Sequence, residues 1–313
     1  MKINIVLFLS ILVCIASTPL YSNILTLSIP IIEQGGASSQ ERVENTFLRW
    51  LQAGGVDLIA VHTYTPTATI DELLQKVNGI VFMGDPSALN TESAYYKASK
   101  YIIDKVKEIY DSSEGKTKIP ILFVGNDLTL LTAIMTNKFD YIQNNKIIIE
   151  NSLVFQEVTK VRTYDLFKEL DPEDVVNIST SPICANKLEY LITKENFVNT
   201  KELTDQFDLL ATARSREIEY VAVIQDKKYP FYGISFHPEK IVFEQYYQYF
   251  VPDSFEAIKA ARLIGNSFTF LARTINDRSM TLEEKEKYDF IDPYGPYPEF
   301  WYGTYQYIYN QTQ

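Results

Sequence analysis

The sequence predicts an α/β protein in which a mostly parallel central sheet is flanked by helices. Through the first half of the chain, short apolar runs alternate with segments of helical periodicity, which is the pattern of repeated βα units. The runs are almost continuously apolar, as strands buried on both faces of a sheet should be. The chain has 313 residues, of which 46% are hydrophobic and 22% charged, so one large core can form without disulfide bonds. We therefore expect one α/β domain over residues 19–278.

The first half is expected to contain strands that alternate with helices. Each strand is a short apolar run, and these runs are residues 24–32, 56–61, 79–83 and 119–124. Each helix carries apolar residues at helical spacing, and the helices are residues 41–53, 71–77, 94–110 and 128–135. Gly54 and Gly55 supply a stop signal for the first of these helices. Successive βα units of this length form a parallel sheet with right-handed crossovers.

The second half is less regular. Short strands are expected at residues 188–193, 209–213, 220–225 and 231–236, and a long helix with one apolar stripe at residues 253–275. Residues 279–313 are rich in tyrosine, proline and acidic residues. Because aromatic side chains this dense are seldom left in water, we expect these residues to form a C-terminal tail that is wrapped on the surface.

The N-terminus has the pattern of a secretory signal peptide. Lys2 precedes an apolar run that ends at Ala16, and the small residues Ser17 and Thr18 follow. The run is too short to span a bilayer comfortably. An uncleaved anchor or a buried first strand is the alternative. A cleaved signal over residues 1–18 predicts a secreted or lysosomal/vacuolar protein, with no membrane association after cleavage.

Charge and cysteine content narrow the classes of partner. The formal net charge is −11, which disfavours nucleic acid and anionic membrane surfaces. Cys14 lies within the predicted signal, so the mature chain would keep only Cys184 and no internal disulfide. His62 and His237 are the only histidines, and no Cys/His cluster is present. We therefore expect neither a metal nor another cofactor.

The first candidate site is the turn after the predicted strand 119–124. It reads Gly125-Asn126-Asp127, and an apolar helix follows. A sharp turn at this position projects one side chain over the sheet and directs the N–H groups of the next helix toward it. Enzymes place a nucleophile there, because those groups lower its pKa and stabilise an oxyanion. The alternative is that Asp127 only caps the helix.

The second candidate site is the apolar strand that ends at His237. Pro238 fixes the backbone after the histidine, and Glu239 follows it. A histidine at a strand end with a carboxylate close to it is the arrangement of a general base and the group that orients it. A purely structural histidine is the alternative reading.

The stretch Tyr-Pro-Phe-Tyr-Gly-Ile-Ser-Phe-His-Pro-Glu-Lys, residues 229–240, resembles the histidine motif of the γ-glutamyl hydrolase family. Leu-Ser-Ile-Pro at residues 27–30, together with the helix expected at 41–53, is similar to the first βα unit of that family. Residues 78–85 are similar to its oxyanion loop. The resemblance extends over residues 24–275.

The resemblance implies a class I glutamine amidotransferase-like (flavodoxin-like) fold and a secreted or lysosomal cysteine peptidase of family C26. Such enzymes remove γ-linked glutamates from folylpoly-γ-glutamates. It implies a γ-glutamyl or folate-like small molecule as ligand and a second copy, in a homodimer, as partner. The residues that match the family's site are Asp127 at the nucleophile position with His237 and Glu239, and Gly84, Asp85 and Leu128 around the oxyanion.

Three departures from the family put catalysis in doubt. The family's Gly-x-Cys-x-Gly reads Gly125-Asn126-Asp127-Leu128-Thr129 here, the second of its paired oxyanion glycines is Asp85, and its additional histidine is absent from residues 184–188. A carboxylate is a far weaker nucleophile toward an amide than a thiolate. We therefore expect a pseudoenzyme in which Asp127 caps the helix and pairs with His237.

Two alternatives keep an activity. His237 could work with another nucleophile, such as Cys184, or with an activated water, although Cys184 has the character of a buried small apolar residue. Asp127 could instead attack an ester or alkyl substrate with His237 as its base.

Overall fold

The computed structural model describes residues 22–27, 29–33, 36–84, 88–244, 251–288, 299–301 and 304–310. The predicted signal peptide, residues 1–18, and Asp85 lie outside these ranges. No helix within them combines the length and the apolar character needed to cross a membrane. Within the same ranges, no group of three or more His, Cys, Asp or Glu side chains is arranged to hold a metal ion.

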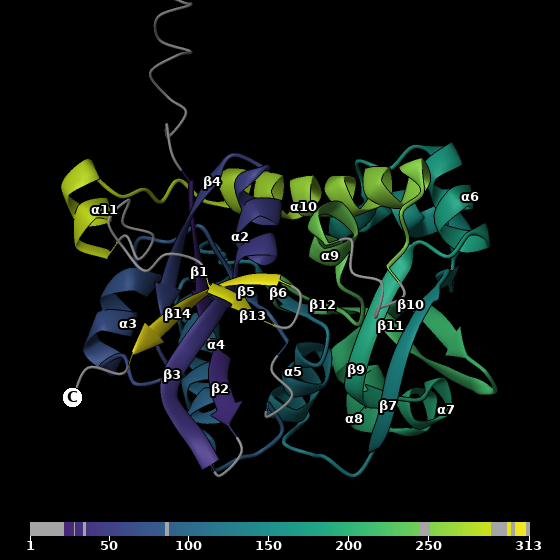
Figure 1. Cartoon of the computed structure of the whole chain (residues 1–313), viewed down its shortest axis with the longest axis horizontal. Helices are drawn as coiled ribbons and strands as arrows, with labels where there is room; N and C mark the ends of the chain where they lie inside the picture. The colour runs from purple at the N-terminus through teal and green to yellow at the C-terminus, as the bar shows by residue number, and fades with distance from the viewer. Residues whose placement is uncertain are drawn as a thin grey trace, which may run out of the picture.

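An eight-stranded sheet forms the centre of the molecule (Figure 1). Its order is β4 (Val56–Val61), β1 (Ser22–Leu27), β5 (Gly79–Phe82), β6 (Ile121–Val124), β12 (Phe231–Ile234), β11 (Ile218–Asp226), β10 (Phe207–Ser215) and β8 (Val154–Phe155). The first five strands pair in parallel, and the last three join in antiparallel orientation. The predicted α/β class with a mostly parallel sheet is confirmed.

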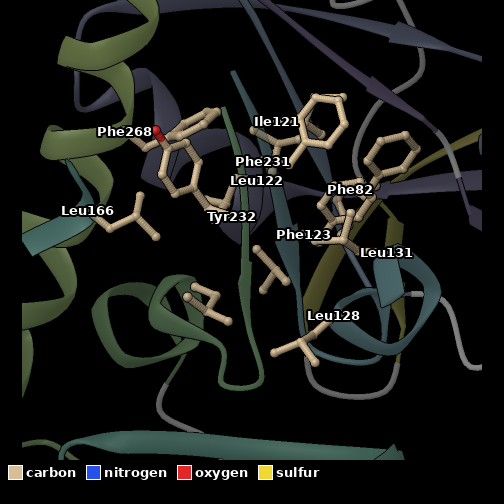
Figure 2. Close-up of a cluster of buried hydrophobic side chains, with 14 of the residues drawn as sticks. Phe82, Ile121, Leu122, Phe123, Leu128, Leu131, Leu166, Phe231, Tyr232 and Phe268 are labelled. Atoms are coloured by element: carbon tan, nitrogen blue, oxygen red, sulfur yellow. The ribbon is translucent and has the colours of Figure 1, made fainter. Parts of the chain in front are cut away.

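Helices cover both faces of this sheet because its central strands are apolar on both sides. The larger helices are α2 (Asn45–Gln52), α3 (Thr67–Leu74), α4 (Ala94–Ser112), α5 (Asp127–Thr136) and α10 (Phe255–Ile275). Every residue of β5, β6 and β12 is buried. Figure 2 shows Phe82, Phe123 and Leu131 packed on one side of these strands and Tyr232, Leu166 and Phe268 on the other. The rings of Phe82 and Phe123 stack with centroids 4.8 Å apart.

The expected strand 24–32 and the expected helix 41–53 are wrong in detail. The first segment is divided into β1 and β2 (Ile29–Glu33), and residues 41–44 belong to β3 (Gly36–Glu44), so α2 begins at Asn45. Residues 41–44 are in a strand rather than a helix because β3 pairs on both sides, with β2 and with a C-terminal strand. Pairing in a sheet here outweighs the local preference for a helix. Alternation along β3 agrees with this, since Glu41 and Val43 are buried while Arg42 and Glu44 are partly exposed.

The described C-terminal residues form one helix and two strands, and the strands extend the hairpin of β2 and β3. The described part contains α11 (Leu282–Tyr288), β13 (Glu299–Trp301) and β14 (Thr304–Asn310). A second sheet has the order β13-β14-β3-β2. The two ends of the described chain therefore meet in one small sheet, beside α2 (Figure 1).

A third, two-stranded sheet was missed in the sequence. It consists of β7 (Ile142–Asn151) and β9 (Cys184–Ile192), paired antiparallel. β9 begins four residues before the expected strand at 188–193. Short elements complete this half: η1 (Val158–Thr163), η2 (Asp165–Phe167), α6 (Pro172–Thr180), α7 (Lys194–Asn199), α8 (Lys201–Gln206) and α9 (Pro238–Phe243).

Candidate active site

The candidate site lies at the carboxyl ends of β5, β6 and β12. These three strands are neighbours in the sheet and run in parallel, so their carboxyl ends meet at one edge. Gly84 follows β5, Asp127 opens the helix after β6, and His237 follows β12. Three segments that are far apart in the sequence are thereby brought together.

Gly125 forms the turn between β6 and α5. Its φ is +65°, in the left-handed region that favours glycine. A Cβ at this position would lie 2.6 Å from Nε2 of His237, and the Gly125 N–H donates to the carbonyl oxygen of Ile234 (2.8 Å). The imidazole therefore packs directly on the turn that leads to Asp127.

The Asp127 side chain is fully buried and turned toward β5 and α4. Its Oδ2 accepts hydrogen bonds from the Gly84 N–H (2.8 Å) and from the hydroxyl of Tyr95 (2.6 Å). Gly84 has a φ of +90°, and a Cβ there would lie 2.6 Å from the carbonyl oxygen of Val124. The loop after β5 therefore lies directly against the turn, and its N–H reaches the carboxylate for this reason.

The expectation that Asp127 caps its helix is wrong. Asn126 is the N-cap residue of α5 and makes no side-chain cap bond, while Asp127 is the first helical residue. The Asn126 side chain instead bonds to β9: its Oδ1 accepts from the backbone N–H groups of Glu189 (2.9 Å) and Tyr190 (3.3 Å). This contact ties β9 to the turn, and no pattern in the sequence indicated it.

Leu128 was expected to supply a second N–H to an oxyanion. The residue is buried, and its N–H donates to the carbonyl oxygen of Gly125 at 3.2 Å, within the turn. Both expected donors, Gly84 and Leu128, therefore have an acceptor in this chain.

His237 and Glu239 form a buried pair. Nδ1 of His237 lies 2.8 Å from Oε1 of Glu239, and the His237 N–H donates to the carbonyl oxygen of Ala185 (2.8 Å). An ionised carboxylate can only accept, so Nδ1 must carry the proton in this contact and Nε2 is left as the basic nitrogen. Nε2 is the ring atom that lies nearest to Gly125, so the basic nitrogen faces the turn between β6 and α5.

Charged side chains behind His237 hold α9 in place. Lys240 Nζ lies 3.2 Å from Glu44 Oε2 and 3.1 Å from Glu244 Oε1. Burial alone would raise the pKa of Glu44, but the positive charges of Lys240 and Arg42 lower this pKa to about 2. Burial acts on Lys240 in the opposite sense, yet the carboxylates around it keep the pKa of Lys240 above its usual range. Glu44 and Glu244 had no signal in the sequence, since they come from β3 and from beyond α9.

Cys184 does not have the properties of a substitute nucleophile. It is the first residue of β9 and is fully buried. Burial raises the pKa of its thiol well above the usual range, so the thiol is protonated near neutral pH, whereas the thiolate is the reactive form.

Relatives are found among curated γ-glutamyl hydrolases. The chain is 25% identical over 252 residues to γ-glutamyl hydrolase 1 of Arabidopsis thaliana, covering 80% of this chain and 69% of the relative. It is 22% identical over 251 residues to the γ-glutamyl hydrolase of Homo sapiens, covering 77% and 74%. It is 23% identical over 208 residues to that of Mus musculus, covering 64% and 61%. The matched region thus spans about three fifths to three quarters of the lengths of these relatives.

No protein-family model matches the chain. A solved structure described as that of a putative GMP synthase protein from Thermoplasma acidophilum is similar over 85% of this chain and 98% of its own, with 15% identity and a TM-score of 0.48. The curated relatives span plants and mammals, carry one name, and each match most of the α/β domain. On these similarities, this chain resembles the γ-glutamyl hydrolases over most of its α/β domain.

Proposed function

We propose that this chain is a γ-glutamyl hydrolase-like protein of the folylpoly-γ-glutamate type whose catalysis is impaired by the carboxylate at position 127. The proposal takes Asp127, in the turn Gly125-Asn126-Asp127, as the counterpart of the family's cysteine. A carboxylate attacking an amide would give an acid anhydride, which is a poor intermediate compared with a thioester. Loss of a nucleophile lowers the turnover number by about 10⁶ in a well-studied catalytic triad.

One observation carries the proposal. The Asp127 carboxylate accepts the Gly84 N–H at 2.8 Å, and that N–H belongs to the loop expected to bind a developing oxyanion. An oxygen of the protein thus occupies the donor that a tetrahedral intermediate would need. Removing one such donor typically costs about 10²- to 10³-fold in turnover number, so the substituted position weakens both attack and stabilisation of the intermediate.

The rest of the site is held in a fixed arrangement. His237 and Glu239 are paired at 2.8 Å, and α9 is held by the buried contacts of Lys240. We propose a small γ-glutamyl or folate-like molecule as the ligand. With the predicted signal peptide, the proposed location is outside the cell or in a lysosome or vacuole.

The test is release of glutamate from a poly-γ-glutamyl substrate by the purified chain beside its Asp127→Cys variant. We expect no release above the buffer blank from the unmodified chain and measurable release from Asp127→Cys. The gained activity should disappear in Asp127→Cys/His237→Ala, which keeps the thiol and removes the base. Turnover by the unmodified chain that is lost in Asp127→Ala would contradict the proposal.

A second candidate is a working hydrolase in which His237 activates a water or another nucleophile. The buried His237–Glu239 contact favours it, because that pair has the geometry of an oriented base. This candidate requires activity of the unmodified chain that is abolished by His237→Ala and resists thiol alkylation. An ester formed at Asp127 would instead appear as a mass shift of the peptide that contains it after substrate trapping.

A further inference from the structure

Strand β9 passes beside both halves of the candidate site. The carbonyl oxygen of Ala185 accepts the His237 N–H (2.8 Å). Four residues later, the Glu189 N–H donates to Oδ1 of Asn126 (2.9 Å), in the turn between β6 and α5. Lys187 lies midway between these two anchors, about 7 Å along the strand from each. Its backbone is therefore fixed next to the histidine and next to the turn.

The side chain of Lys187 is on the open face of β9. Cys184, Asn186 and Leu188 are buried, whereas Lys187 is exposed, as expected for side chains that alternate along a strand. β7 and β9 lie side by side (Figure 1), and Ile148 of β7 is directly opposite Lys187. Opposite residues of an antiparallel pair project to the same face, and Ile148 is 36% exposed. The open face thus presents a cation next to an apolar side chain.

The proposed ligand needs a cation at this site. A γ-glutamyl chain carries an α-carboxylate on its glutamates, while the protein has a net charge of −11 and buried acids at Asp127 and Glu239. An excess of one charge disfavours a ligand of the same sign. Lys240, which is close to His237 in sequence, is largely buried and already contacts two carboxylates. Lys187 is the basic residue that β9 contains, and it is exposed.

We propose that Lys187 binds an α-carboxylate of the γ-glutamyl ligand and so selects an anionic chain over an uncharged one. This inference rests on the proposed function. The long and flexible stem of a lysine lets its ammonium group reach from the strand over the neighbouring turn, and the methylene groups of a glutamyl unit can lie on Ile148. Glu189, on the same face, does not oppose the carboxylate with a full charge, because Lys146 pairs with it at 3.5 Å.

The test compares two ligands by isothermal titration calorimetry on the full purified chain. One is tri-γ-glutamate, and the other is the same molecule with its α-carboxylates converted to carboxamides. Lys187→Gln should bind tri-γ-glutamate with a Kd on the order of tenfold higher than the unmodified chain, because a hydrogen bond to a charged group is lost. The same substitution should change the Kd for the amidated ligand little, since that ligand offers no carboxylate. The effects of the two changes should therefore not be additive.

Two variants serve as controls. Lys187→Arg keeps the positive charge and should retain most of the preference for tri-γ-glutamate over the amidated ligand. Lys116→Gln removes a highly exposed lysine in the turn before β6. That turn is at the amino ends of the parallel strands, on the opposite edge of the sheet from the candidate site, so the Kd for both ligands should stay the same.

The outcomes separate this inference from the proposed function. Equal binding of tri-γ-glutamate by the unmodified chain and by Lys187→Gln would overturn the role of Lys187 and leave the proposed ligand standing. A loss of the same size for both ligands would also overturn it, because the lysine would then act through the fold and not on a carboxylate. Failure of the unmodified chain to bind tri-γ-glutamate would contradict the proposed ligand itself, and this inference with it.

Discussion

At the scale of single residues, the position of Asp127 is decided by donors from two other elements. The Gly84 N–H comes from the loop after β5, and the Tyr95 hydroxyl comes from the first turn of α4. Tyr95 is fully buried, so its hydroxyl cannot turn to water in place of the carboxylate. The carboxylate is therefore held against β5 rather than directed toward a substrate.

Tyr95→Phe should destabilise the protein by about 1.5–3 kcal/mol, because it removes a donor from a buried carboxylate and leaves the ring in place. The measurement is the free energy of unfolding from urea denaturation. Tyr101→Phe is the matched control on the same helix: its hydroxyl donates to Asp71 at 2.8 Å in a partly exposed contact, so about 0.5–1.5 kcal/mol is expected. A smaller loss for Tyr95→Phe than for Tyr101→Phe would show that Asp127 does not depend on this bond.

The sequence indicates part of this site because part of it is local. His237 and Glu239 are two residues apart, and Gly125 and Asp127 lie in one turn, so their chemistry can be read along the chain. Tyr95 looks like one apolar position of a helix, and its contact with Asp127 spans 32 residues. Asn126 likewise bonds to β9, 63 residues later. Side chains that meet only through the tertiary fold leave no spacing pattern.

At the scale of elements, contacts of α9 with β3 and α2 fix where α9 begins, and His237 directly precedes it. Lys240 contacts Glu44 at the start of α2 and Glu244 after α9, and the Thr46 hydroxyl donates to Glu244 (3.2 Å). An ionised lysine among ionised carboxylates in a buried place is stable only while all partners remain. The orientation of the histidine thus depends on Glu44, a residue of β3 that the sequence predicted to be helical.

Lys240→Met should cost about 3–5 kcal/mol of unfolding free energy, because the two carboxylates lose their buried cation. Lys160→Met removes a solvent-exposed pair with Glu157 and should leave the stability nearly unchanged, because exposed ion pairs contribute little. The measurement is again urea denaturation, at pH 5. A loss below about 1 kcal/mol for Lys240→Met would contradict the assigned role.

The Glu44–Lys240 pair should also make the free energy of unfolding depend on pH. The folded pKa of Glu44, about 2, lies below its usual value of 4.5. The folded state therefore binds fewer protons at this group than the unfolded state, so its contribution is present above pH 4.5 and is lost as the pH falls toward 2. The unmodified chain should lose more stability than Lys240→Met between pH 5 and pH 3. Parallel curves for the two proteins would argue against an ionised Glu44 paired to Lys240.

At the scale of the whole molecule, one large sheet is extended by a small sheet built from both ends of the described chain. The large sheet follows from repeated βα units and was predicted in outline, because each unit is encoded within a short stretch. The small sheet was not predicted, since β3 and β14 are separated by more than 250 residues. Its pairing brings Gln306 opposite Glu44 and Tyr309 opposite Glu41.

The C-terminal strand β14 should therefore help to fix the surroundings of both histidines, His62 and His237, through the carboxylates of β3. Glu41 contacts Nδ1 of His62 (3.0 Å) just beyond β4, and Glu44 contacts Lys240 just beyond His237. Removing residues 289–313 deprives β3 of a pairing partner along residues 40–44 and costs about 0.5–1.5 kcal/mol for each lost hydrogen bond. We expect a lower Tm and changed imidazole NMR signals for both His62 and His237, which are easily assigned because the chain has no other histidine. Removing only residues 311–313 leaves β14 in place and should change neither signal. Unchanged signals after the longer deletion would mean that β3 holds its two carboxylates without the C-terminal strand.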